Sequence, residues 1–227
     1  MNFTFYGHAC FSVELGGRVL LFDPFITPNP LAAGIDINSV RADFILVSHG
    51  HQDHLADAVC LAKRAGATVI ANYEVAMWLA KNGAPKIHPL NHGGACSFDF
   101  GRVKLVNAVH SSGLPDGAYG GNPGGFVVES ARGNFYYCGD TALTMDMKLI
   151  GESTRLAFAA LCIGGNFTMD AADAVKAAQL VNCDQIVGVH YDTFPPIKID
   201  HEEARRQFQA AGKKLHLLKI GETQSFS

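Results

Sequence analysis

Three histidines and an aspartate lie within six residues of one another, in the segment His49-Gly50-His51-Gln52-Asp53-His54. Imidazole nitrogens and carboxylate oxygens are the ligands that zinc and other borderline divalent cations take in proteins. In an extended backbone, His49 and His51 place both rings on one side, where they can bind one cation. Asp53 and His54 come after the chain bends and can turn toward a second cation. We therefore expect a metal centre here, not a polar surface turn.

The elements around this segment predict a strand-to-helix loop. Residues 44–47 are an apolar run that is typical of a buried strand, and the motif begins where that strand should end. Residues 55–65 have apolar side chains at helical spacing, and Gly66 follows as a stop signal. Ligands on such a loop lie at the rim of a sheet. Further ligands are therefore expected at the ends of other strands.

Three isolated residues fit that expectation, because each stands at the C-terminal end of a run that predicts a strand: His110, Asp140 and His190. Taken singly, each is more often a half-buried histidine or a turn-forming aspartate than a metal ligand. Their shared position at strand ends, downstream of the first motif, favours metal binding. The resulting set contains no cysteine. It admits Zn²⁺, Mn²⁺ or Fe²⁺, with two divalent ions expected and zinc as the first choice.

The composition predicts one globular domain spanning residues 1–227. Charged residues make up 17% of the chain, the net charge is −3 and the basic residues do not cluster, which argues against a nucleic-acid partner. The six cysteines show no CxxC spacing, as expected in a reducing compartment. Neither a signal peptide nor an apolar run of membrane length is expected. These features predict a cytoplasmic protein with a small-molecule substrate, and they are compatible with a homo-oligomer.

Hairpin strands followed by alternating strands and helices occur twice, before and after about residue 115. This order predicts two mixed sheets packed face to face, with helices outside. Two irregular stretches, residues 25–40 and 111–125, follow strand ends and are expected at the metal rim, the second as a mobile lip. Their apolar residues are expected to form a small pocket over the metals: Phe25, Ile26, Leu31, Leu114 and Tyr119.

The segment from His49 to His54 resembles the HxHxDH signature of the metallo-β-lactamase superfamily, and the three later residues occur in the order of that family. The resemblance implies an α+β fold, a four-layer αββα sandwich of two mixed β-sheets. It also implies the following assignment: His49, His51 and His110 hold one cation, Asp53, His54 and His190 hold the other, and Asp140 bridges them. Since His51 stands where the oxygen-reducing diiron branch carries a glutamate, redox chemistry is not expected.

Four other segments, residues 6–11, 23–30, 163–169 and 190–195, resemble the small single-domain metal-dependent hydrolases of family UPF0173. The resemblance implies a hydrolase in which a metal-bridging hydroxide attacks a small ester, lactone or phosphodiester, with Asp53 or His8 moving the proton. The scarcity of basic residues near the two irregular stretches favours an ester or lactone. The alternative is a non-catalytic metal-binding regulatory or interaction protein on the same fold, against which the open coordination positions argue.

Four residues are expected to support the metals or the substrate. His8, which follows Gly7, can face the metals as a proton donor or belong to the core. Asp23 can accept the free N–H of a ligand histidine. Asn166 lies in a glycine turn whose backbone donors suit an anionic group, and Tyr119 can contact the substrate. The remaining histidines are expected at the surface or at helix caps: His88, His92, His201 and His216.

Overall fold

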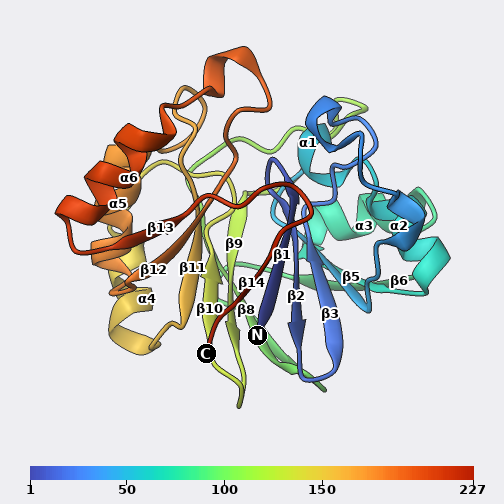
Figure 1. Cartoon of the computed structure of the whole chain (residues 1–227). Helices are drawn as coiled ribbons and strands as arrows, with labels where there is room; N and C mark the ends of the chain where they lie inside the picture. Colours follow the sequence, from blue (N-terminus) through green and yellow to red (C-terminus); the bar gives the residue numbers. More distant parts are fainter.

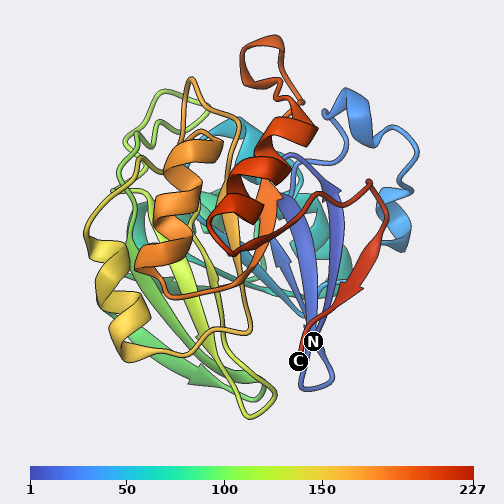
Figure 2. The same ribbon diagram turned by 60° about the vertical axis from the view of Figure 1, so that its left-hand side comes forward.

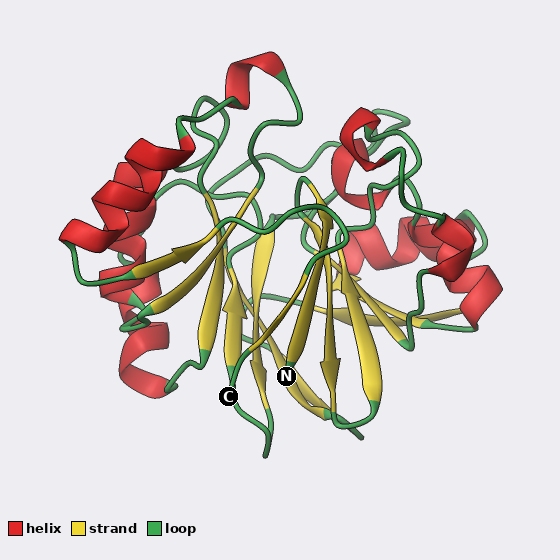
Figure 3. Ribbon diagram, in the orientation of Figure 1, coloured by secondary structure: helices red, strands yellow, loops and turns green.

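The computed structural model describes all 227 residues and shows two mixed β-sheets that face each other. Helices cover the outer face of each sheet (Figure 1, Figure 3). The αββα sandwich predicted from the sequence is thereby confirmed. None of the helices combines the length and the apolar character that a bilayer crossing requires.

The first sheet contains seven strands, in the spatial order β14-β1-β2-β3-β4-β5-β6. Their bounds are β1 (Asn2–Gly7), β2 (Cys10–Leu15), β3 (Arg18–Phe22), β4 (Phe44–Val47), β5 (Thr68–Asn72), β6 (Lys86–Leu90) and β14 (Thr223–Ser225). The helices on its outer face are α1 (Gln52–Leu55), α2 (Ala58–Ala65) and α3 (Tyr73–Lys81).

The second sheet also has seven strands, in the order β13-β12-β11-β10-β9-β8-β7. Their bounds are β7 (Ala95–Phe98), β8 (Gly101–Asn107), β9 (Gly124–Glu129), β10 (Phe135–Tyr137), β11 (Phe158–Cys162), β12 (Gln185–Val189) and β13 (Lys214–His216). It is covered by α4 (Asp146–Ser153), α5 (Ala171–Leu180) and α6 (His201–Ala210). Three short 3₁₀ turns complete the chain: η1 (Pro30–Ala32), η2 (Ile37–Ser39) and η3 (Pro195–Ile197).

The chain changes sheets between β6 and β7, so the division expected near residue 115 is wrong. The hairpin β7–β8 pairs with β9, and β14 returns to the first sheet beside β1. This return brings the two termini together, as Figure 2 shows, and the Met1 amino group donates to the Phe226 carbonyl at 2.7 Å.

Two elements had no clear sequence signal. Strand β6 contains Pro89, which an edge strand tolerates, and α4 starts without a side-chain cap.

A continuous apolar core of 43 buried residues, rich in aromatic side chains, includes the inner faces of both sheets. Within it, the Phe11 ring stacks between Phe3 and Phe22, with ring centroids 4.5 and 4.6 Å apart. A second core of 20 buried residues includes the apolar faces of α2 and α3 and the strands beneath them. Strands covered on both faces must be apolar throughout, which is why β4 and β11 read as unbroken apolar runs.

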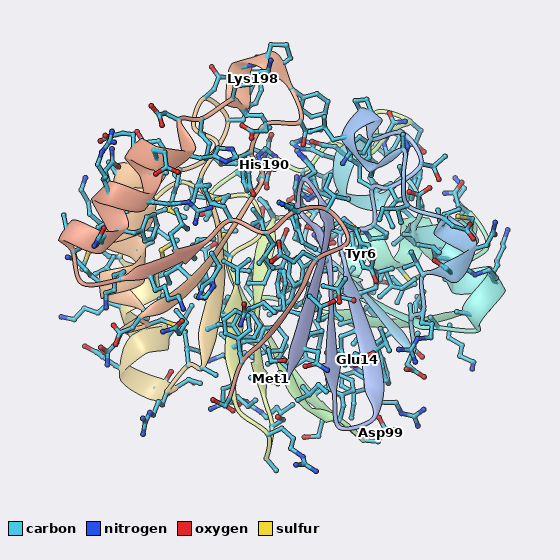
Figure 4. All side chains as sticks on the ribbon, viewed as in Figure 1. Met1, Tyr6, Glu14, Asp99, His190 and Lys198 are labelled. Atoms are coloured by element: carbon cyan, nitrogen blue, oxygen red, sulfur yellow. The ribbon has the colours of Figure 1, made fainter.

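Strand directions place all the candidate ligands at one rim of the sandwich. Strands β3 and β4 are parallel, and so are β10, β11 and β12. Strand β8 is antiparallel to β9, which is antiparallel to β10, so β8 and β10 run the same way. The C-terminal ends of β3 and β4 therefore lie at one edge of the first sheet, and those of β8, β10 and β12 lie at one edge of the second. The contacts of His54 with Asp140 and of Asp23 with Tyr137 show that these two edges adjoin. His190, labelled in Figure 4, lies at this edge, where the two halves of the molecule meet.

Candidate metal centre

The first motif leaves the end of β4 and enters α1, as predicted, but the helix expected over residues 55–65 is divided. Helix α1 ends at Leu55 and α2 begins at Ala58. His51 is the N-cap residue of α1, and Asp53 lies in its first turn. This short first helix turns the two halves of the motif in different directions. It explains how one segment supplies two groups of ligands.

The first group consists of His49, His51 and His110, whose ligand atoms all lie within 4.8 Å of one another. The Nε2 atom of His49 is 2.9 Å from Nδ1 of His51. The other nitrogen of His51, Nε2, is 3.3 Å from the Ser111 hydroxyl. His51 therefore turns Nδ1 toward His49 and its outer nitrogen toward Ser111, an arrangement that suits a metal ligand, because ligand histidines usually bond to a neighbouring group through the other ring nitrogen.

The second group consists of Asp53, His54 and His190, and His8 lies with them inside the same 4.8 Å limit. Asp140 stands between the groups. Its Oδ2 atom is 2.9 Å from Nε2 of His190 and 3.3 Å from Nε2 of His54. The same oxygen is 3.6 Å from Nε2 of His110, in the first group. A single carboxylate oxygen thus faces imidazoles of both groups.

The residues of both groups fit divalent cations. Nε2 of His54 and Oδ1 of Asp140 are buried without a hydrogen-bond partner. Unsatisfied buried polar atoms are rare and need an explanation, which bound cations provide for ligand atoms. The donor set is nitrogen and carboxylate oxygen without thiolate, which suits Zn²⁺, Mn²⁺ or Fe²⁺.

The electrostatics of the site keep its carboxylates ionised. Burial alone would raise the pKa of Asp140, but His190 and His54 outweigh it and hold that pKa well below its usual range. Burial would likewise raise the pKa of Asp53, yet His54 and the hydrogen bond from His8 lower it. For His54, burial acts to lower the pKa, but Asp140 and Asp23 raise it well above its usual value. A cation binding at His54 must therefore displace a proton.

Four of the other five histidines of the site favour the neutral ring, which is the form that binds metals. The exception is His190: burial acts to lower its pKa, but Asp140 raises that pKa above its usual value. Burial lowers the pKa of His49 well below its ordinary value, and the neighbouring His54 adds to this shift. Burial also lowers the pKa of His51 and His110. The pKa of His8 falls to about 4, mainly through burial, although the hydrogen bond to Asp53 opposes the change.

Asp23, at the end of β3, lies fully buried beneath His54. Its Oδ2 accepts a hydrogen bond from Nδ1 of His54 at 2.7 Å, from the Ser48 hydroxyl at 2.6 Å and from the Tyr137 hydroxyl at 2.5 Å. Its Oδ1 accepts the Ser48 N–H at 2.7 Å. Since Tyr137 belongs to the second sheet, this carboxylate joins both sheets and fixes the ring of one candidate ligand.

Backbone strain gathers at the same rim. His8, Asp23 and His190 all have positive φ angles, of 55°, 39° and 56°. Residues with side chains rarely adopt this conformation, and such strain concentrates at functional sites. The N–H of His190 donates to the His8 carbonyl at 2.8 Å. This hydrogen bond joins two of the strained turns, one from each sheet.

Several residues that support the candidate ligands had no sequence signal. Thr141 joins the segments that carry His110 and Asp140, because its hydroxyl accepts the Val109 N–H at 2.9 Å. Asp57 accepts backbone N–H groups at the start of the 25–40 stretch, at 2.7 and 2.9 Å. Serine, threonine and aspartate in turns are too common to be singled out, and no fixed spacing marks these positions.

The five apolar residues that were expected to form a pocket over the metals do not share one environment. Ile26 and Leu114 are buried in the core beside α2 and α3, while Leu31 and Tyr119 are 50% and 68% exposed. Phe25 contacts a site residue, with its ring centroid 5.5 Å from that of His8.

Hydrogen bonds also anchor the 111–125 stretch, which was expected to be a mobile lip. The Asn72 side chain donates to the carbonyls of Gly120 and Asn122 at 2.8 and 3.0 Å. The hydroxyl of Tyr119 lies 3.1 Å from the Asn122 side chain and so stays within the loop. Ser112 accepts the Gly50 N–H at 3.0 Å, which ties the stretch to the first motif.

The turn at Asn166 uses part of its backbone donors internally. The N–H groups of Gly165, Phe167 and Thr168 donate to backbone carbonyls within the turn, so these donors are not free for an anion. Asn166 itself is exposed and has a φ of 56°.

The four histidines placed outside the site by the sequence do lie outside it, but His216 is buried, not superficial. Its Nε2 lies 2.9 Å from the Gln185 side chain. His201, at the start of α6, pairs with Asp192 at 2.6 Å.

The model of the Beta-lactamase superfamily domain matches residues 2–190, a range that includes all seven candidate ligands. A UPF0173 metal-dependent hydrolase of Flavobacterium johnsoniae is 54% identical over 98% of this chain and 99% of its own length. A UPF0173 metal-dependent hydrolase of Thermus thermophilus is 44% identical over 96% of each chain.

Solved structures of similar proteins share this fold. Igni18, a metallo hydrolase from the archaeon Ignicoccus hospitalis, is 32% identical and superimposes with a TM-score of 0.89. The alignment covers 100% of this chain and 99% of that one. The isothiocyanate hydrolase from Delia radicum gut bacteria has a TM-score of 0.81 over 100% and 99% of the two chains. At 18% identity, this second likeness shows the shared fold alone.

Proposed function

Since this chain belongs to the UPF0173 metal-dependent hydrolases of the β-lactamase superfamily, we propose that it hydrolyses a small ester, lactone or phosphodiester at a two-cation centre. His49, His51 and His110 hold one cation, and Asp53, His54 and His190 hold the other. The observation that carries the proposal is the position of Asp140, whose Oδ2 lies within 3.6 Å of imidazole nitrogens from both groups. A shared carboxylate offsets the repulsion between two neighbouring cations.

Bound divalent cations supply a nucleophile at neutral pH, by lowering the pKa of water, and they polarise the substrate oxygen. The side chains define where the substrate can approach. Asp53 is 28% exposed, whereas His8 beside it is 0% exposed. Asp53 is therefore the group that can accept a proton at the open face of the site, and His8 supports it from behind.

The charge of the rim favours a neutral substrate. The stretches 25–40 and 111–125 contain no lysine or arginine, and the segment between His190 and α6 contains only Lys198. Figure 4 shows Lys198 at the tip of this segment, farther out than His190. A phosphodiester would gain little from a rim with so few cations, because phosphate recognition usually relies on arginine or lysine. We therefore place esters and lactones ahead of phosphodiesters.

We expect a strong metal chelator to reduce turnover of a chromogenic ester or lactone to the uncatalysed rate. Added Zn²⁺ or Mn²⁺ should restore it, because the nucleophile depends on the cations. The measurement is the release of the coloured product before chelation, after chelation and after reconstitution. The same series with a chromogenic phosphodiester ranks the substrate classes. Turnover that survives complete removal of metal would contradict the proposal, and bound metal without turnover of any ester, lactone or phosphodiester would favour the non-catalytic alternative.

A further inference from the structure

The His8 ring is enclosed by protein on all sides. Its side chain is 0% exposed, and the rings of Phe25 and Phe194 flank it with centroids 5.5 and 5.4 Å away. Both ring nitrogens must therefore find their partners within the protein. Nε2 lies 3.0 Å from Oδ2 of Asp53, and Nδ1 lies 3.0 Å from the hydroxyl oxygen of Thr193.

The two partners decide which nitrogen carries the proton. A carboxylate that binds a cation is ionised and can only accept hydrogen bonds, so the contact to Asp53 requires a proton on Nε2 of His8. In a neutral imidazole, Nδ1 is then an acceptor and needs a donor. The only group within reach is the hydroxyl of Thr193.

The Thr193 hydroxyl is free to play this part. Its other neighbour is the Tyr191 carbonyl, at 3.4 Å, and that carbonyl already accepts the Thr193 N–H at 2.9 Å. The contact to His8 is the shorter one, so the hydroxyl proton points to the ring. Thr193 belongs to the segment that follows β12. His190 lies in the same turn, and its N–H donates to the His8 carbonyl at 2.8 Å.

We propose that Thr193 is a positioning residue of the metal centre: its hydroxyl holds His8 in the Nε2–H tautomer, and His8 in turn fixes the carboxylate of Asp53. The inference rests on the proposed function, in which Asp53 is a ligand of the second cation. It gives His8 a role different from the proton donor expected from the sequence. The proposal requires a hydroxyl donor at position 193, which valine, with the same shape, does not supply.

The experiment has two parts. Nitrogen-15 NMR of protein labelled in its histidines, with His8→Gln used to assign the His8 signals, reports the tautomer of His8 in the metal-free and the Zn²⁺-loaded protein. Calorimetric titration with Zn²⁺ then compares the wild type with Thr193→Val and Thr193→Ser. Thr68→Val, at the end of β5 opposite the rim, is the matched control for the loss of a threonine hydroxyl. Circular dichroism verifies that each variant is folded.

We expect the wild type to show the Nε2–H tautomer of His8 in both states. Thr193→Val should mix the two tautomers and weaken binding of the second Zn²⁺ by roughly tenfold, the lower end of the range for lost outer contacts of a ligand. Thr193→Ser should recover most of the affinity, because it restores the donor, and Thr68→Val should behave as the wild type.

Two results would overturn the inference. One is an Nδ1–H tautomer in the wild type, which would make Nε2 of His8 a ligand of the cation itself. The other is a Thr193→Val protein that keeps both the tautomer and the Zn²⁺ affinity. If the wild type binds no Zn²⁺, the proposed function fails, while the tautomer of the metal-free protein still decides the part played by Thr193.

Discussion

Replacement of Asp140 by asparagine is expected to empty both cation positions and to lower turnover at least about a hundredfold, since even outer contacts of metal ligands contribute 10- to 100-fold in affinity or activity. The carboxylate oxygen of Asp140 is the one atom that faces imidazoles of both ligand groups, at 2.9 to 3.6 Å. Asparagine keeps the shape but loses the negative charge that two neighbouring cations share. Elemental analysis and turnover of the best chromogenic substrate measure the effect.

Two matched variants make this result specific. Asp53→Asn should cost only the second cation, because Asp53 contacts His8 and His54 but no residue of the first group. His88→Ala should change neither metal content nor turnover, because His88 lies on the edge strand β6 and packs against Phe98. An Asp140→Asn protein that retains two cations and full activity would show that this residue is not the bridge.

Replacement of Asp23 by alanine is expected to lower the free energy of unfolding of the metal-free protein by about 3–5 kcal/mol, the usual cost of removing one member of a buried charged pair. The carboxylate receives four hydrogen bonds, from His54, from the hydroxyl and N–H of Ser48, and from Tyr137. All three donor residues are buried and would be left without this acceptor. Urea denaturation followed by circular dichroism gives the change.

Tyr137→Phe is the milder variant for comparison, since it removes one donor and leaves the carboxylate bonded to the other two residues. We expect it to lower the free energy of unfolding by about 1–2 kcal/mol. If Asp23→Ala costs no more than Tyr137→Phe, the carboxylate is not the common acceptor that joins the two sheets.

The sequence alone was sufficient to place the candidate ligands, because metal ligands are uncommon residue types with a demanding spacing. A histidine or aspartate directly after an apolar strand is easy to recognise. Parallel strands bring such residues to one rim without further information. Asp23 illustrates the same logic, since its position at the end of β3 placed it beside His54.

The parts that the sequence could not predict depend on distant pairing. Tyr137 reads as an ordinary strand residue, and only the packing of one sheet on the other brings its hydroxyl to Asp23. Nothing in the sequence marks Thr193 either, because its contact with His8 forms only when the turn after β12 packs against the residues after β1. The apolar residues Ile26 and Leu114 could equally have faced the rim or the core, and burial of apolar area against α2 and α3 decided for the core. The position at which the chain changes sheets likewise depends on which strands β7 and β8 join.

The metal content of the folded protein shows whether seven side chains form a centre for two cations. The protein is freed of metal, reconstituted with Zn²⁺, cleared of unbound ions and analysed for zinc per chain. We expect two equivalents in the wild type, one in Asp53→Asn and essentially none in Asp140→Asn. A wild-type protein that is folded by circular dichroism and holds one equivalent or none would contradict this expectation.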